Sequence, residues 1–166
     1  MALLNIGAED SKGGELQKAV YPLLQKAGDA GYIHFIGNIE ANTALLGGAD
    51  VIVADGYSGN ILLKTVEGTA KLLLGEMKKA FLSSTKSKLG ALLVKDSLGD
   101  VKKLLDPSEV GGTPFLGISK PVLKAHGSSD ARAIRNAVFR AVEYAQSGII
   151  ADVEAHIDVM KVEKNG

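Results

Sequence analysis

The chain has 166 residues, 46% of them hydrophobic and 23% charged, with 19 basic and 19 acidic side chains and a formal net charge of +0. This composition fits one soluble globular domain with a sizeable core, excludes a disordered chain, and provides no general field that would attract nucleic acid. The absence of cysteine excludes a disulfide framework, a thiolate zinc site and a cysteine nucleophile, and the three histidines show no spacing typical of a metal site. No segment is long enough to cross a membrane and the first residues lack the features of a signal peptide, so we expect a cytoplasmic protein.

The first part of the chain is predicted to alternate between short strands and helices. Strands are expected at residues 3–6, 32–36 and 51–54, and helices at 15–26 and 40–46. Pro22 falls inside the first helix and predicts a kink or a late start there. This alternation is typical of a parallel sheet with helices on both faces. Because the first strand begins almost at residue 1, we expect an upstream part of the protein to be absent from this chain.

Residues 51–65 are the stretch around which the chain is organised. They begin with a β-branched apolar strand at 51–54, of the kind found in the centre of parallel sheets. A glycine-containing loop follows, and apolar residues then recur at helical spacing from about residue 60 to residue 81. Ser58 or Asn60 is expected to be the N-cap of that helix.

The start of this helix is a candidate anion site. The backbone N–H groups of Ser58, Gly59 and Asn60 are expected to face the loop, with the positive end of the helix dipole behind them. Proteins bind phosphate at such places. Lys64 lies about one turn inside the helix, and its ammonium is expected to reach back over the loop. The alternative is an ordinary turn between strand and helix with a solvated Lys64.

Residues 83–106 are expected to form an amphipathic helical insert that ends at Asp106-Pro107. Lysines alternate there with leucine and valine; they are Lys86, Lys88, Lys95, Lys102 and Lys103. A cationic helix or helical hairpin of this kind lies on an anionic membrane surface or packs against a partner subunit. The alternative is a helix that covers the protein's own core and leaves its lysines in solvent.

Two further strands are expected at residues 115–118 and 121–127. Alternation in the second of them places Lys124 and His126 on the same face. A lysine inside a strand is costly unless it is paired or lies beside an anion, so Lys124 is expected to point toward a site. His126 stands at the end of the strand, where α/β sheets hold ligands, although a lone histidine is also a common structural residue.

The loop after this strand repeats the pattern of the first loop. Ser128, Ser129 or Asp130 is expected to cap the next helix. Arg132 and Arg135 lie in its first two turns, at the end of the helix dipole that disfavours cations. A bound anion would explain these arginines, and so would an ion pair with Asp130 or a nearby carboxylate. A last helix is expected from residue 149 onward.

Several segments together resemble the PlsX family of phosphate acyltransferases. They are the two strand, loop and helix units at 54–65 and 124–134 and the shorter motifs at 4–7, 37–40 and 111–117. The resemblance extends over nearly the whole chain, to about residue 157. Members of the family are substantially longer, so residues 1–166 are identified as the C-terminal part of a single α/β enzyme whose N-terminal part is absent from this chain.

The family resemblance implies the fold, the reaction and the surroundings of the protein. The fold is expected to be a three-layer αβα architecture with a mainly parallel sheet, similar to phosphotransacetylases and isopropylmalate dehydrogenases, plus the helical insert. The reaction is transfer of a fatty acyl group from acyl carrier protein to inorganic phosphate, which yields acyl phosphate for phospholipid synthesis without cofactor or metal. The protein is expected to be a cytoplasmic homodimer, attached peripherally to an anionic membrane through the insert, with no nucleic acid partner.

This reaction assigns roles to the residues above. Phosphate attacks a thioester carbonyl, so the site must hold a dianion, stabilise an oxyanion and ease departure of a thiolate. His126 or Lys124 is expected to donate a proton to the leaving sulfur, and Asp55 to orient Lys64 or Lys124. The groups expected to hold phosphate or the oxyanion are Lys64, Arg132 and the loop residues Ser58, Gly59, Asn60, Gly127, Ser128, Ser129 and Asp130.

Two alternatives and one assignment stay open. The chain fits a phosphotransacetylase-like enzyme that uses coenzyme A, or a non-catalytic fragment that binds phosphate and membranes. Which of the two loops takes phosphate and which faces the acyl carbonyl is not decided by the residues.

Overall fold

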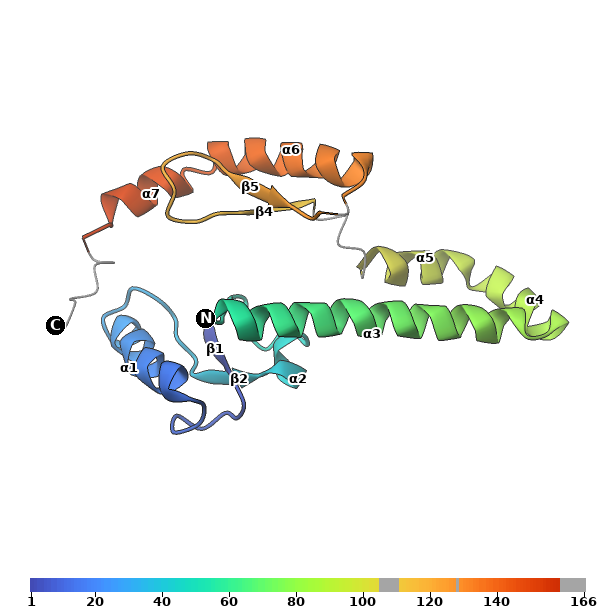
Figure 1. Cartoon of the computed structure of the whole chain (residues 1–166), viewed down its shortest axis with the longest axis horizontal. Coiled ribbons are helices and arrows are strands. Elements are labelled where there is room, and N and C mark those ends of the chain that lie inside the picture. The colour runs from blue at the N-terminus through green and yellow to red at the C-terminus, as the bar shows by residue number, and fades with distance from the viewer. Residues whose placement is uncertain (105–110, 128, 159–166) are drawn as a thin grey trace. The chain divides into compact units, whose positions relative to one another are not determined.

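The computed structural model of the protein describes residues 1–104, 111–127 and 129–158. The chain divides into two compact units, Met1–Gly75 and Glu76–Gly166, and helix α3 (Gly56–Leu82) begins in the first and ends in the second. The described strands form a parallel three-stranded sheet in the first unit and an antiparallel two-stranded sheet in the second (Figure 1). The α/β class is therefore confirmed, whereas the antiparallel pair was not predicted.

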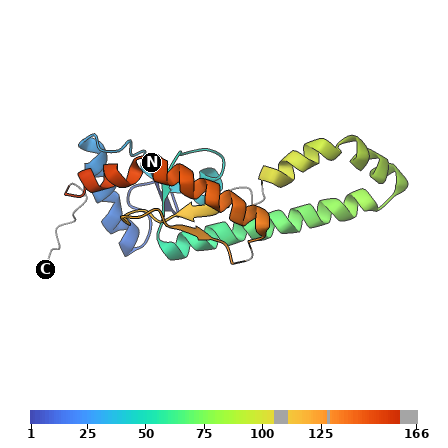
Figure 2. The same cartoon turned by 90° about the horizontal axis from the view of Figure 1, so that it is seen from above.

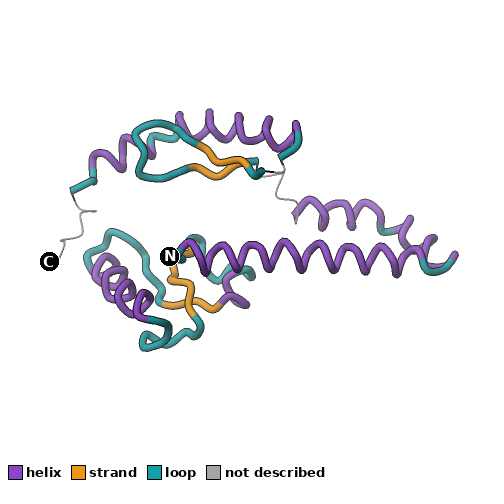
Figure 3. The backbone as a smooth tube through the Cα atoms, in the orientation of Figure 1, coloured by secondary structure: helices purple, strands orange, loops and turns teal. Residues whose placement is uncertain are grey.

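The parallel sheet of the first unit, whose strands are among the orange segments of Figure 3, has the strand order β2-β1-β3. Its strands are β1 (Ala2–Asn5), β2 (Asn38–Glu40) and β3 (Ile52–Val53). All four residues of β1 are buried, because this strand pairs with a neighbour on each edge. The prediction that the strand at 51–54 is central is wrong, since in the described part of the chain β3 pairs only with β1 and its residues are half-buried.

Helices cover both faces of this small sheet. On one face, Ala2 and Leu4 pack with Ala44 of helix α2 (Ala41–Ala44), and Leu62 of α3 packs against this cluster. On the other face, helix α1 (Glu15–Asp29) contacts β1. The layering of helix, sheet and helix predicted from the alternating pattern is thus present around β1. Helix α1 begins before Pro22, so the proline does not delay its start.

Residues 32–36 do not form the predicted strand, because the strand β2 lies further on at residues 38–40. The Ile36 N–H donates to the Met1 carbonyl, and the Leu3 N–H donates to the Gly37 carbonyl. The chain before β2 therefore runs beside the first residues of β1. The paired residues of the ladder begin where Asn38 lies opposite Leu3.

In the second unit, two helices form the predicted insert. They are α4 (Thr85–Leu93) and α5 (Lys95–Leu104), and they follow the long continuous helix α3 (Figure 2). Ser84 caps α4 by accepting a hydrogen bond from the Ser87 N–H, at 3.1 Å. The helical prediction for residues 83–106 is confirmed up to residue 104, and its end at Asp106-Pro107 lies outside the described residues.

The antiparallel pair precedes the last two helices. Its strands are β4 (Gly112–Pro114) and β5 (Leu123–Ala125), and the helices are α6 (Ala131–Gln146) and α7 (Ile149–Ala155). The predicted strand at 115–118 is wrong. The Phe115 N–H still donates to the Val122 carbonyl, but the chain then turns through Gly117 and returns as β5. Helix α6 packs on both strands of the pair.

Candidate functional site

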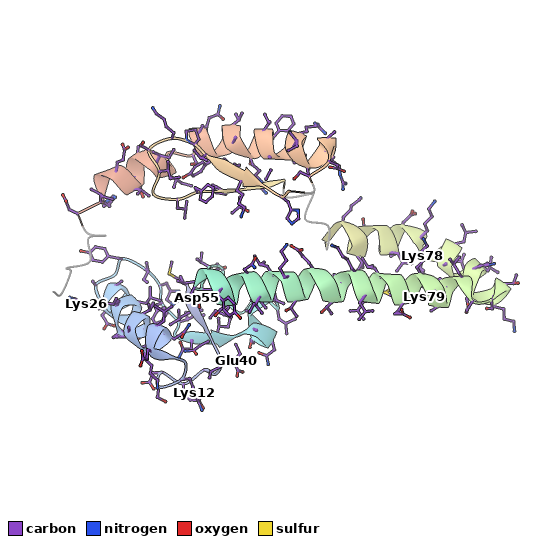
Figure 4. All side chains as sticks on the ribbon, viewed as in Figure 1. Lys12, Lys26, Glu40, Asp55, Lys78 and Lys79 are labelled. Carbon is purple, nitrogen blue, oxygen red and sulfur yellow. The ribbon has the colours of Figure 1, made fainter. Side chains whose placement is uncertain are left out.

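Asp55 determines the local structure at the first predicted loop. It follows β3, and its Oδ1 accepts hydrogen bonds from the backbone N–H groups of Tyr57, at 2.9 Å, and Ser58, at 2.8 Å. The Gly59 N–H donates to the Asp55 carbonyl at 2.9 Å. Helix α3 therefore begins at Gly56, with Asp55 at its start (Figure 4). The predicted N-cap at Ser58 or Asn60 is wrong, because a carboxylate three residues earlier already binds the free N–H groups.

This capping changes the electrostatics of the predicted anion site. The pKa of Asp55 lies below its usual value of 3.8. The largest cause is the hydrogen bond that its carboxylate accepts from the Ser58 backbone N–H, and the next is a hydrogen bond from the Ser58 side chain. A carboxylate of the chain itself is thus the anion at the positive end of α3. A phosphate at the N–H groups of Ser58 and Gly59 would have to compete with it.

Lys64 forms an ion pair on its own helix. Its Nζ binds the Glu67 carboxylate at 2.8 Å, a pair three residues apart on the surface of α3. Asp55 instead accepts a hydrogen bond from the Gln17 Nε2, at 3.3 Å. In this structure Lys64 therefore pairs with a residue of its own helix, whereas its predicted reach over the loop and the predicted role of Asp55 in orienting Lys64 or Lys124 stay predictions.

The second predicted loop joins β5 to α6. Lys124 and His126 are exposed, whereas Leu123 and Ala125 are half-buried, which confirms the predicted alternation. The Asp130 side chain caps α6 by accepting from the Ala133 N–H at 2.8 Å, and this confirms one of the three predicted caps. Gly127 is exposed, and Ser128 lies outside the described residues.

Two further side chains of this loop and helix have distinct surroundings. The Ser129 hydroxyl is buried and has no hydrogen-bond partner within the described part of the chain. Its backbone N–H donates to the His126 carbonyl at 3.0 Å. Arg135 lies over the ring of Phe139, with 5.2 Å between its guanidinium carbon and the ring centroid, so it binds an aromatic ring of its own helix. Arg132 lies in the first turn of α6.

The two predicted loops belong to different units. Asp55, Ser58, Gly59, Asn60 and Lys64 lie in the first unit, and the loop from Lys124 to Arg132 lies in the second. Their combination into one site therefore stays a prediction.

Sequence reasoning missed a cavity of about 440 Å³ in the first unit. Of the predicted site residues, Ser58 lines it; its other polar side chains are those of Asn5, Gln17 and Thr65. Asn5 is 9% exposed, and its Nδ2 donates to the Lys12 carbonyl at 3.1 Å. The signal that could have pointed to this place is the asparagine within the apolar residues of the first predicted strand, since a polar side chain there needs hydrogen-bond partners.

The described residues contain neither a metal-binding cluster nor a membrane-spanning helix. No group of three or more histidine, aspartate or glutamate side chains is placed to hold a metal ion among them. Among the helices of residues 1–104, 111–127 and 129–158, none combines the length and the hydrophobicity that a bilayer-spanning segment needs.

Replacing Asp55 by asparagine is expected to flatten the pH dependence of stability. A lowered pKa in the folded state contributes stability above the unfolded value, and this contribution is lost as the pH falls below 3.8. Asparagine remains a good N-cap but does not titrate, so Asp55→Asn is expected to unfold close to wild type at neutral pH and Asp55→Ala at a lower temperature. Thermal unfolding followed by circular dichroism, at neutral pH and below pH 3.8, measures the difference. Parallel pH curves for wild type and Asp55→Asn would contradict it.

The chain is similar to known proteins over nearly its full length. A family model described as fatty acid synthesis protein matches residues 1–152. A phosphate acyltransferase of Lysinibacillus sphaericus is 47% identical over 162 residues, covering 96% of this chain and 48% of the relative. One of Oceanobacillus iheyensis is 47% identical, covering 99% of this chain and 48% of the relative, and one of Clostridioides difficile is 43% identical, covering 95% and 45%.

These matches agree with the motifs in the sequence. The chain spans about half the length of the curated relatives it matches. Because the family model matches residues 1–152, the chain belongs to the fatty acid synthesis protein family, the PlsX family of phosphate acyltransferases that its motifs resemble.

Proposed function

We propose that this chain is the C-terminal part of an enzyme that transfers a fatty acyl group from acyl carrier protein to inorganic phosphate. The product, acyl phosphate, supplies phospholipid synthesis. Support comes from the name phosphate acyltransferase shared by the relatives, from the description of the family, and from the motifs of the two loops. The whole enzyme then has the three-layer fold of phosphotransacetylases and isopropylmalate dehydrogenases.

The observation that carries this proposal is the buried Ser129 hydroxyl at the start of α6. Within the described residues this hydroxyl has no hydrogen-bond partner, and a buried hydroxyl in that state costs free energy unless a ligand completes the bond. Arg132 lies in the first turn of α6, so it places a cation close to this hydroxyl in the chain. We therefore assign the phosphate or the oxyanion to the second loop, at Gly127, Ser128, Ser129, Asp130 and Arg132.

The first loop has a weaker claim to phosphate. Its N–H groups at Tyr57 and Ser58 already bind the Asp55 carboxylate, and Lys64 binds Glu67. In the reaction, a phosphate oxygen forms a bond to the thioester carbon, the carbon–sulfur bond breaks, and the sulfur takes a proton from His126 or Lys124. Ser58, Gly59 and Asn60 are then left to bind the acyl donor rather than the phosphate.

Formation of acyl phosphate by the full-length protein tests the proposal. We expect acyl transfer to labelled inorganic phosphate with acyl carrier protein as donor, and much slower transfer from coenzyme A. Preference for coenzyme A would favour the phosphotransacetylase alternative. The 166-residue chain alone is expected to be inactive, and turnover by it would refute the need for an N-terminal part.

The helices α4 and α5 are proposed to attach the homodimer to an anionic membrane surface. The apolar side chains of α4 are exposed: Leu89 is 62%, Leu92 67% and Leu93 82% exposed. Lys86 and Lys88 lie on the same short helix. Exposed leucines beside lysines fit an interfacial helix better than a helix that covers its own core.

Replacing Leu92 and Leu93 together by glutamate is expected to reduce membrane binding at least about tenfold, since each buried leucine contributes roughly 1.5–3 kcal/mol. Flotation with anionic vesicles at low and high salt measures the bound fraction. Glutamates at Leu72 and Leu73 of α3, which are 63% and 57% exposed, are the matched control. Binding that persists in the α4 variant, or that ignores salt in wild type, would contradict the proposal.

A further inference from the structure

The cavity in the first unit lies at the carboxyl ends of the parallel strands. Its walls come from the end of β1, the start of α1, the residue after β2 and the first turns of α3. They are Leu4, Asn5, Ile6, Gly13, Gly14, Gln17, Ala41, Ser58, Ile61, Leu62 and Thr65. Its volume of about 440 Å³ falls within the range of small-molecule sites in proteins.

The topology of the sheet makes this place a binding crevice. The chain leaves β1 through α1 and returns as β2 on one side of it, whereas β3 pairs with the opposite edge of β1. The strand order 2-1-3 therefore puts a topological switch point between β1 and β3. Open α/β sheets bind ligands in the crevice outside the carboxyl ends of strands at such a point.

Within the described part of the chain, the cavity walls contain no charged side chain, so an uncharged ligand suits them best. Their polar groups are the amides of Asn5 and Gln17 and the hydroxyls of Ser58 and Thr65, and the remaining side chains are apolar. The Gln17 amide is oriented by its hydrogen bond to the Asp55 carboxylate, at 3.3 Å. That carboxylate, placed beside the cavity, disfavours a phosphate there.

We propose that this cavity binds the pantetheine arm through which carrier proteins and coenzyme A hold acyl thioesters. Pantetheine is an uncharged chain in which amide and hydroxyl groups alternate with apolar segments. Gln17, Ser58 and Thr65 bind its polar groups, and Ile61 and Leu62 contact its apolar segments. Asn5 is a positioning residue, because its side chain bonds the Ile6 N–H and the Lys12 carbonyl and so holds the wall of the cavity.

This inference rests on the proposed function, since it assumes a thioester donor, but binding tests it separately. Pantetheine is titrated into the isotope-labelled 166-residue chain, and the backbone amide signals are followed by NMR. We expect the signals of Gln17, Ser58 and Thr65 to move. Movement confined to other residues, or no movement at millimolar pantetheine, overturns the proposal.

Two tryptophan variants, one in the cavity wall and one outside it, test the assignment. Thr65→Trp is expected to raise the Kd for pantetheine at least tenfold by filling the cavity. Thr69→Trp, on the same exposed helix but outside the wall, is expected to change it less than twofold. Both positions are exposed, so both variants should fold, which matching circular dichroism spectra would verify. Equal Kd values for the two variants overturn the assignment.

Steady-state kinetics of the full-length protein show which acyl donor supplies the pantetheine arm and whether phosphate binding depends on the cavity. Thr65→Trp is expected to raise the KM for the acyl donor at least tenfold and to leave the KM for phosphate within twofold. A rise in the KM for phosphate alone overturns the inference. Acyl carrier protein and coenzyme A are compared as donors to identify the source. If the wild-type protein forms no acyl phosphate with either donor, the proposed function is wrong. The NMR titration still tests whether the cavity binds pantetheine.

Discussion

Replacing His126 by alanine in the full-length protein is expected to lower kcat for acyl phosphate formation by about 10²- to 10⁴-fold, the usual contribution of a general acid. His126 is exposed and directly follows β5, and its carbonyl accepts a hydrogen bond from the N–H of Ser129, whose buried hydroxyl has no partner within the described residues. A proton donated there reaches the sulfur as the carbon–sulfur bond breaks. The KM for phosphate is expected to change little, because the phosphate is assigned to the loop that follows.

The choice of leaving group separates a proton donor from a structural histidine. A thioester of a strongly acidic thiol needs no proton to leave, so the loss caused by His126→Ala is expected to shrink with such a substrate. His34→Ala, at an exposed histidine of the first unit, is the control and should leave kcat unchanged. An equal loss of kcat with both thioesters would indicate a structural role for His126. An unchanged kcat would indicate that Lys124 donates the proton instead.

Replacing Gly111 by alanine is expected to lower the free energy of unfolding of the second unit by about 2–5 kcal/mol. Gly111 is buried and has a φ of +84°, which favours glycine. A methyl group on it would lie 2.5 Å from the backbone nitrogen of Ala137 in α6. The clash involves backbone atoms, so it is relieved only by moving the helix away from β4.

Gly117 is the matched control for this substitution. Its φ is +76°, but no atom lies within 4 Å of the position that a methyl group would take there. Gly117→Ala therefore carries the backbone strain alone, about 1–2 kcal/mol. Urea unfolding of the 166-residue chain, followed by circular dichroism, compares the two variants. Equal losses would show that α6 does not pack on Gly111 as described.

Local signals located the helices and the strands β1, β3 and β5, but they did not locate β2 and β4. The apolar segments at 32–36 and 115–118 have strand composition, yet neither forms a strand. The observed strands β2 and β4 contain asparagine, glutamate, glycine and proline, which are poor strand formers. Their backbones happen to lie opposite β1 and β5, and that pairing outweighs intrinsic preference.

The candidate site shows the same division. The sequence pointed to Asp55, Ser58 and Lys64 as a group, and to the loop from His126 to Arg132. It could not tell that the Asp55 carboxylate would take the N–H groups of Tyr57 and Ser58 or that Lys64 would bind Glu67. In each case several possible partners lie at similar distances along the chain, and the conformation of the loop determines which of them is bound.

By itself, the sequence determined the α/β class, the helices α1, α3 and α6, the helical insert and the family, because helical periodicity and short motifs are properties of neighbouring residues. Only the tertiary structure decided the strand order and the cavity beside β1, α1 and α3. These features depend on backbone segments that are distant in the chain, such as Asn5, Gln17 and Ser58, whose approach no local pattern encodes.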